Sequence, residues 1–313
     1  MNAMVRTNFF IKFAVCKYKT IIAPELKRIL KIACLFFLSC LSLTGRAQQT
    51  SLREEVSFLT DSLREGRGFG TGGAQATAFY LIRQMRNAGL RTTVQSFMEG
   101  GRIGHNVIGV TPGWFRRYIV VGAYFDGLGK TASGYYPGAD SNASGVSALL
   151  SLARTFASSC SGDVGIIFVG FDGHNASMAG SHAFVSSAMG DYKVSLMVNL
   201  DILGSTAAPL SEGRPDFLIA LGGSSWRFSI ENANRSTGLQ LAYDYYGSRN
   251  FTDLFYRRIS DQRWFLEAGI PSVMFTSGIT MDTNKVTDTA ESLDYDIFSK
   301  RVELISRWLR SQL

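Results

Sequence analysis

Short apolar runs recur along the chain, separated by polar or amphipathic stretches. The runs are rich in β-branched residues and are bounded by glycine, proline or aspartate, which is typical of strands buried on both faces. They cover residues 106–110, 118–124, 164–171, 194–200, 217–221 and 272–275. Since each run is too short for a buried helix of ordinary length, the pattern predicts the strands of a central sheet.

Several of the intervening stretches carry apolar residues at helical spacing. The clearest is residues 142–156, whose apolar residues form one stripe. Either Asn142 or Ser144 is suited to cap the start of this helix. Strands that alternate with helices predict an α/β fold, a three-layer sandwich with a mostly parallel or mixed central sheet and helices on both faces. The other predicted helices are residues 51–63, 74–88 and 294–313.

The first 47 residues differ from the rest and are predicted to be a signal peptide. Basic residues precede an apolar run at residues 32–43, and Gly45-Arg-Ala47 supplies small residues for cleavage. The run of about a dozen residues is too short for the ~20 of a membrane-spanning helix. We therefore expect export to the periplasm or the extracellular space, with lipidation at Cys40 as a weaker alternative. Residues 48–313 are then one domain of a size that can bury a large core.

The basic character of the chain belongs to this leader. It contains eight of the 32 Lys and Arg residues and one of the 25 acidic residues, so residues 48–313 have 24 of each and no formal net charge. Nucleic-acid binding therefore has no support from charge, and no membrane span is expected in the mature chain. Cys160 is the single cysteine left after cleavage, so no intramolecular disulfide can form.

Polar residues cluster where the predicted strands end. The segments are Val121-Gly-Ala-Tyr-Phe-Asp126, Gly138-Ala-Asp-Ser-Asn-Ala-Ser-Gly145, Phe171-Asp-Gly-His-Asn-Ala-Ser-Met-Ala-Gly-Ser181, Asn199-Leu-Asp201 and Asn284-Lys-Val-Thr-Asp-Thr289. In open α/β sheets ligands bind at the carboxyl ends of strands. These segments are therefore expected to form one site.

Their order and spacing resemble the co-catalytic zinc aminopeptidases, a family that includes the glutaminyl cyclases, and the chain is thus interpreted as a zinc-exopeptidase-like domain. The resemblance implies a site in which two His, a Glu, an Asp and a bridging Asp bind two zinc ions, while a second Glu acts as general base. In this chain most of those positions carry other residues. The first His is replaced by Tyr124, the bridging Asp by Ser141, the Glu pair by His174 and Asn175, and the last His by Asn284, whereas Asp201 is retained.

These replacements argue against zinc as a cofactor and against the family's chemistry. No residue is assigned as catalytic, because His174 occupies the position of the family's general base. Asp126 and Asp140 correspond to residues that support the metal ligands from behind. We expect neutral donors (Tyr124, Ser141, Asn175 and Asn284) to stabilise the Asp201 carboxylate, unless these polar residues merely line a solvated cleft.

The sequence therefore favours an exported, non-catalytic relative of the peptidases that keeps a cleft for a peptide or a partner protein. Two alternatives remain open. The first is an active hydrolase, which would use either Ser141 with His174 or one metal ion held by Asp126, Asp140, Asp201 and His174. The second is a structural protein of the cell envelope.

Overall fold

The computed structural model describes residues 48–132, 134–159 and 162–313. Residues 49–313 form one compact unit. The predicted signal peptide, the alternative lipidation site Cys40 and the single mature cysteine Cys160 lie outside the described residues. Among the described residues, no helix is both long and apolar enough to cross a membrane.

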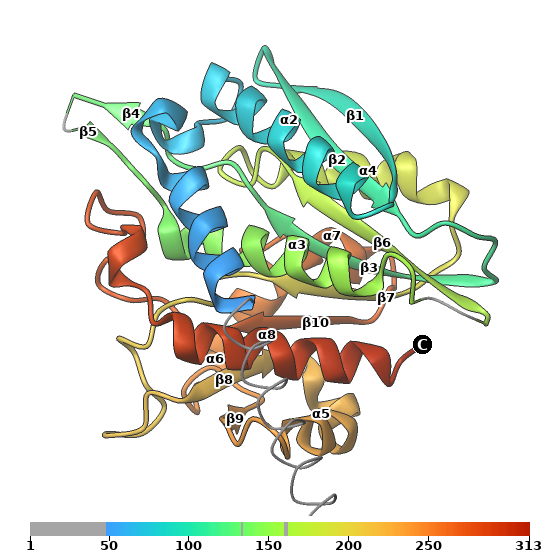
Figure 1. Ribbon diagram of the computed structural model, residues 1–313, viewed down its shortest axis with the longest axis vertical. Helices are drawn as coiled ribbons and strands as arrows, with labels where there is room; N and C mark the ends of the chain where they lie inside the picture. Colours follow the sequence, from blue (N-terminus) through green and yellow to red (C-terminus); the bar gives the residue numbers. More distant parts are fainter. Residues whose placement is uncertain (1–47, 133, 160–161) are drawn as a thin grey trace, which may run out of the picture. The chain divides into compact units, whose positions relative to one another are not determined.

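The described residues form an eight-stranded mixed sheet (Figure 1). The inner strands β6, β3, β7 and β10 run parallel to one another, while β2 and β8 pair antiparallel on either side of them. In spatial order the strands are β1 (Arg91–Glu99), β2 (Arg102–Val110), β6 (Val164–Phe171), β3 (Arg117–Tyr124), β7 (Val194–Leu200), β10 (Ser272–Thr276), β8 (Phe217–Leu221) and β9 (Gln240–Ala242). Every predicted apolar run is a strand of this sheet. A separate two-stranded hairpin consists of β4 (Lys130–Thr131) and β5 (Gly134–Tyr135).

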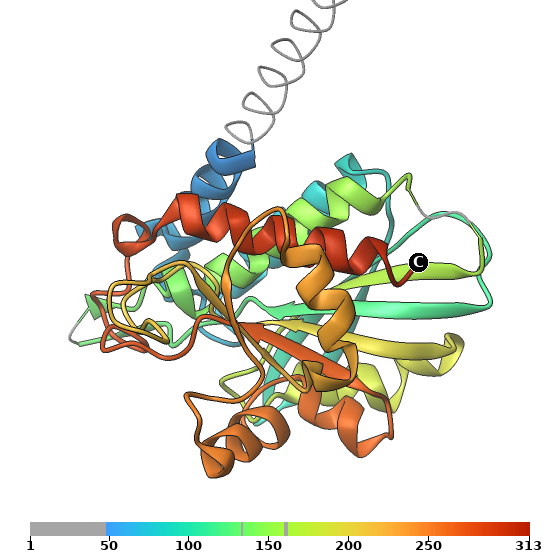
Figure 2. The same ribbon diagram turned by 90° about the horizontal axis from the view of Figure 1, so that it is seen from below.

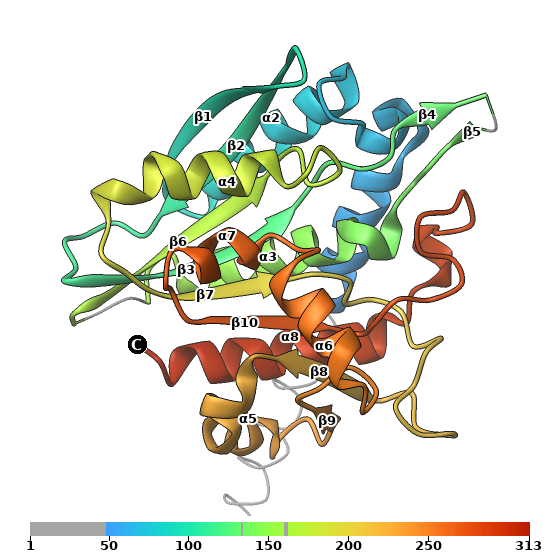
Figure 3. The same ribbon diagram turned by 180° about the vertical axis from the view of Figure 1, so that it is seen from behind.

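Helices cover both faces of the sheet, as predicted (Figure 2). One face carries the helix at residues 48–60, α2 (Gly72–Asn87), α3 (Gly145–Phe156) and α8 (Tyr295–Arg310), with α5 (Arg227–Asn234) packed against α8. The other face carries α4 (Ala179–Ser186), α6 (Arg249–Arg257) and α7 (Gln262–Glu267) (Figure 3). Short 3-10 segments occupy Ser62–Arg67, Ala188–Asp191, Gly223–Trp226 and Ala290–Ser292, and a π-helical turn spans Ala139–Ser144.

Each face of the sheet has its own apolar core. Side chains such as Val121, Phe168 and Val198 point toward α3 and α8, while Val120 and Phe171 point toward the opposite layer. This alternation along each strand explains why the inner strands are apolar throughout.

Two residues proposed as caps for α3 have different roles. The Asn142 side chain accepts a hydrogen bond from the Gly145 amide (3.1 Å) and donates one to the Leu200 carbonyl (2.9 Å). The Ser144 hydroxyl instead donates to the Asp140 carbonyl (2.8 Å), so Ser144 does not cap the helix. Asn142 thereby ties the start of α3 to the end of β7, next to Asp201.

Candidate functional site

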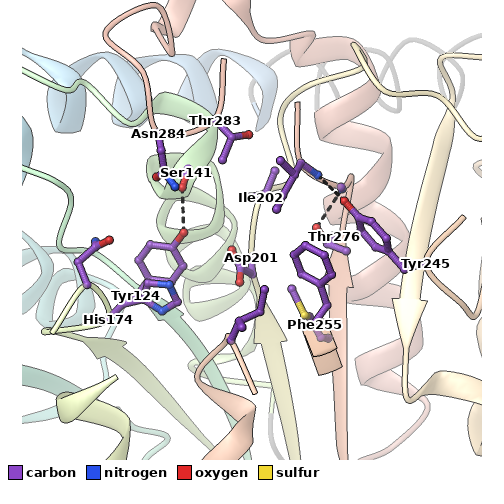
Figure 4. Close-up of a pocket in the computed structure, with 15 residues that line it drawn as sticks. Tyr124, Ser141, His174, Asp201, Ile202, Tyr245, Phe255, Thr276, Thr283 and Asn284 are labelled. Carbon is purple, nitrogen blue, oxygen red and sulfur yellow. Dashed lines mark hydrogen bonds between the residues drawn. The ribbon is translucent and has the colours of Figure 1, made fainter. Parts of the chain in front are cut away.

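A pocket of about 150 Å³ opens at the carboxyl ends of the parallel strands (Figure 4). The pocket has a polar wall and an apolar wall. The apolar wall includes Ile202, Tyr245, Phe255, Ile259 and Ile279. Figure 4 shows Asp201 between the two walls. The polar wall contains Tyr124, Ser141, His174, Asn175 and Asn284. The pocket therefore brings together every residue predicted at the degenerate metal positions.

Tyr124 is the last residue of β3 and lies in the polar wall of the pocket. Its hydroxyl shares a hydrogen bond with the Ser141 hydroxyl (3.0 Å), and its ring stacks on the His174 ring with centroids 3.7 Å apart. Burial, followed by the nearby Asp201 carboxylate, raises the pKa of Tyr124 well above its ordinary value. Tyr124 is therefore a neutral hydrogen-bonding group at any physiological pH.

His174 is bound to a carboxylate that the sequence did not suggest. Its Nδ1 lies 2.8 Å from Oδ2 of Asp261, and Oδ1 of the fully buried Asp261 accepts a hydrogen bond from the Ser181 hydroxyl (2.6 Å). Burial by itself lowers the pKa of His174, but the carboxylates of Asp261, Asp201 and Asp126 outweigh burial and raise it to about 9. His174 is therefore an imidazolium at neutral pH and a poor general base.

Ser141 does not have the surroundings of a catalytic serine. Its hydroxyl is paired with Tyr124, and the hydrogen bonds of the described residues include none between Ser141 and His174. The pair considered for a serine-hydrolase mechanism is thus brought into one pocket without the contact that such a mechanism needs.

Asp126 and Asp140 are buried and do not line the pocket. Asp126 accepts hydrogen bonds from the backbone amides of His174 (2.8 Å) and Asn175 (3.0 Å), and it fixes the turn after β6. Asp140 accepts from the amides of Gly204 (2.7 Å) and Ser205 (3.1 Å). Burial raises the pKa of both, that of Asp140 to about 7 with a further contribution from Asp288.

Asp201 is buried, and half of its carboxylate has no partner. Its Oδ2 accepts a hydrogen bond from the Ser260 hydroxyl (2.6 Å), whereas Oδ1 has no hydrogen-bond partner among the described residues. Burial raises the pKa of Asp201, while His174, Ser260 and, more weakly, Tyr124 favour the charged form. A buried carboxylate oxygen without a donor is unfavourable, so Asp201 retains an unused capacity to bind a donor group.

The predicted donors to Asp201 are therefore mostly wrong. Asn175 donates to Asp126 (3.3 Å), the Ser141 hydroxyl is paired with Tyr124, and no hydrogen bond joins Asn284 to Asp201 among the described residues. Ser260 is the main donor instead. Asn199 positions it, because the Asn199 amide donates to both Ser260 (2.7 Å) and Gln262 (2.6 Å).

The backbone next to Asp201 is strained. Ile202 has φ 61°, a left-handed conformation that β-branched residues rarely adopt. Asn142 accepts a hydrogen bond from the Ile202 amide (3.0 Å), and the Ile202 carbonyl accepts one from the Ser277 amide (2.7 Å). Backbone strain of this kind concentrates at functional sites, where the surrounding structure maintains it. Here it occurs at the residue directly after Asp201.

The side chains of the pocket do not fit a zinc ion. A zinc site needs a closed set of nitrogen, sulfur or carboxylate donors, whereas here Nδ1 of His174 is already bound to Asp261 and one Asp201 oxygen is bound to Ser260. The set considered for a single metal is also dispersed, because Asp126 and Asp140 bind backbone amides outside the pocket. In the described ranges, no group of three or more His, Cys, Asp or Glu residues could hold a metal ion.

The His174–Asp261 pair predicts a pH dependence of stability. Because the pKa of His174 rises from its ordinary 6.5 to about 9 on folding, its stabilising contribution is complete below pH 6.5 and is lost as the pH rises toward 9. His174→Gln should therefore show a smaller fall in the free energy of unfolding between pH 6.5 and 9 than the parent. Urea denaturation at several pH values measures this difference. Asp140 and Asp172, whose pKa values are raised to about 7, affect both proteins alike. Parallel curves for the two proteins would contradict the assignment of an imidazolium.

Comparisons with known proteins agree with this architecture. The model of Peptidase family M28 matches residues 106–309, which include all the pocket residues named above. No curated protein sequence matches the chain.

Solved structures with the same fold include metal-dependent exopeptidases and a cyclase. BSAP, a zinc aminopeptidase from Bacillus subtilis, is 15% identical with a TM-score of 0.68, and the match covers 84% of this chain and 94% of that one. Porphyromonas gingivalis glutaminyl cyclase is 18% identical with a TM-score of 0.68, covering 85% and 98%. A Zn-dependent exopeptidase from Parabacteroides distasonis is 16% identical with a TM-score of 0.66, covering 82% and 96%. These similarities confirm the predicted fold class.

Proposed function

The chain belongs to peptidase family M28, and from this premise we propose that it is an exported, non-catalytic member that binds the amino terminus of a peptide or of a partner protein. The observation that carries the proposal concerns Asp201, whose buried Oδ1 has no hydrogen-bond partner among the described residues and which lines a pocket that lacks the donors of a zinc site. A ligand ammonium group would supply the missing donor and a compensating positive charge. Charge-assisted hydrogen bonds of this kind are among the stronger ones in proteins.

The rest of the pocket suits one apolar residue that carries this ammonium. Its volume of about 150 Å³ equals that of roughly five water molecules. Tyr245 and Phe255 stack on each other with centroids 4.3 Å apart and form an aromatic wall opposite the polar one. The His174 imidazolium offers Nε2–H as a donor to the carbonyl oxygen of the ligand's amino-terminal residue. Each part of an apolar amino-terminal residue therefore has a complementary group.

The rim of the pocket favours a ligand that continues outward. Ile259 and Ile279 line the pocket and remain 38% and 42% exposed, and Tyr246 and Phe251 nearby are 39% and 54% exposed. Exposed apolar residues grouped around a cavity are typical of an interaction site. We therefore favour a peptide or protein terminus over a small free amine.

Absence of catalysis is proposed from the chemistry of the general-base position. A base must be unprotonated to activate water, and the three carboxylates around His174 hold it protonated at neutral pH. A structural role in the cell envelope does not account for Oδ1 of Asp201, which has no hydrogen-bond partner among the described residues, so we do not favour that role. We infer export from the predicted leader, and amino-terminal sequencing of the exported protein should begin at or near Gln48.

Metal content and hydrolysis together test the proposal that this is a non-catalytic protein. Elemental analysis of protein purified without chelator should find far less than one zinc per chain, and aminoacyl chromogenic substrates should not be cleaved above background. A zinc content near two per chain with chelator-sensitive cleavage would contradict the proposal. Labelling by a fluorophosphonate that disappears in Ser141→Ala would instead support the serine-hydrolase alternative.

A further inference from the structure

The two edges of the sheet differ in a way that the pocket does not explain. The edge strand β9 has three residues, whereas β1 at the opposite edge has nine (Figures 1 and 3). β1 pairs with β2 in unbroken register from Arg91 to Glu99, without a bulge. It contains neither proline nor lysine, and none of its residues is buried. Proteins usually shorten, bend or charge an exposed edge strand, because its free amides and carbonyls attract another strand.

Exposed apolar side chains accompany this edge. Val94 and Met98 of β1 are 45% and 71% exposed, Ile103 of β2 is 51% exposed, and Phe79 of α2 is 71% exposed. Met98 lies directly opposite Ile103 in the register, and Val94 lies on the same face of β1 as Met98. Phe79 and Val94 also line a cavity of about 330 Å³ between α2 and the hairpin. The side chains therefore form one apolar surface beside the open edge.

Charges at the two ends of β1 indicate what covers this surface. Arg91 and Glu99 are exposed, and the ion pairs within the described residues include neither of them. Arg91 has one long contact, to the Gly113 carbonyl (3.4 Å). If β1 pairs antiparallel with an identical strand about Gln95, Arg91 of each copy lies opposite Glu99 of the other. Shifting the register by two residues would separate these charges.

We propose that β1 pairs with β1 of a second copy of this chain, forming a symmetric dimer with one continuous sheet. Self-pairing is favoured over an unrelated strand because the two unpaired charges of β1 complement each other across a two-fold axis. Such an interface is the same patch on both subunits. Trp114, which is 94% exposed and follows Gly113, lies at the Arg91 end of the strand, where it can contribute a large apolar contact.

Charge reversal and its compensation test this dimer. Sedimentation equilibrium of the purified protein should show a monomer–dimer equilibrium. Arg91→Glu and Glu99→Arg each place like charges opposite one another at both ends of the strand pair, and each should raise the dimer Kd roughly tenfold or more. The double variant Arg91→Glu/Glu99→Arg restores opposite charges and should return the Kd to near the parent value. Circular dichroism checks that all variants are folded. We expect them to fold, because Arg91 and Glu99 are both exposed.

Three outcomes would overturn the proposal. They are a parent that stays monomeric at every concentration, a dimer unaffected by the single variants, and a double variant as weak as the singles. If β1 instead pairs with a strand of an unrelated protein, the purified parent would stay monomeric, which is the first of these outcomes. Asp201→Asn should leave the dimer unchanged, because Asp201 is distant from β1 in the order of strands, so this test is independent of the proposed function.

Discussion

Asp201→Asn is expected to weaken the binding of leucine amide by roughly tenfold to a hundredfold, because it removes a charged hydrogen-bond acceptor for the ligand ammonium. Asparagine has nearly the shape of aspartate, and its oxygen can still accept the hydrogen bond from Ser260. Its amide group would then take the place of Oδ1 and would present donors to another donor. Isothermal titration calorimetry of both proteins measures the difference.

The stability of Asp201→Asn separates loss of binding from damage to the fold. Burial raises the pKa of Asp201 and so disfavours its carboxylate, and one carboxylate oxygen has no hydrogen-bond partner among the described residues. Removing the charge should therefore leave the melting temperature unchanged or raise it. A variant that melts several degrees below the parent would mean that the carboxylate stabilises the fold through contacts beyond Ser260. Unchanged affinity for leucine amide would mean that Asp201 does not bind the ammonium.

Arg67→Ala is expected to produce the largest loss of stability, on the order of 3 kcal/mol or more. The Arg67 guanidinium is fully buried and donates to four backbone carbonyls, those of Leu59 (2.7 Å), Phe125 (2.9 Å), Pro137 (2.7 Å) and Gly138 (2.9 Å). Alanine would leave these acceptors without a donor and would create a cavity. Urea denaturation measures the loss.

Arg67 also connects the core to the pocket. Phe125 precedes Asp126, and Gly138 precedes the turn that carries Ser141, so Arg67→Ala should weaken leucine amide binding as well. Arg86→Ala is a matched control, because Arg86 is exposed on α2, and its effect should stay within about 0.5 kcal/mol. A loss below about 1 kcal/mol for Arg67→Ala would show that water replaces the guanidinium at these carbonyls.

The sequence predicts the inner part of the fold well and its edges poorly. Strands such as β3 and β6 are buried on both faces, so their composition alone identifies them. β1 has no buried residue, and its sequence, Arg91-Thr-Thr-Val-Gln-Ser-Phe-Met-Glu99, contains no apolar run. Its strand conformation depends on pairing with β2, which a local pattern does not contain.

The same contrast holds for the pocket. The strand ends identify Tyr124, His174 and Asp201 as neighbours because parallel strands end at one edge of the sheet. The partners of these side chains come from a distant segment, where Ser260 binds Asp201 and Asp261 binds His174. Which donor reaches which carboxylate depends on side-chain geometry across some 60 to 90 residues of sequence, so the donors to Asp201 were mostly predicted wrongly.

Metal-independent recognition of an ammonium group is the central claim, and calorimetry with two matched ligands tests it most directly. Leucine amide and N-acetyl-leucine amide share the leucine side chain and the carboxamide, but acetylation replaces the charged amine that Asp201 is proposed to bind with a neutral, bulkier acetamide. The account predicts that the parent protein, in the presence of a metal chelator, binds one leucine amide per chain and binds the acetylated ligand at least tenfold more weakly. Equal binding of the two ligands, or binding of leucine amide that appears only after zinc is added, would contradict it.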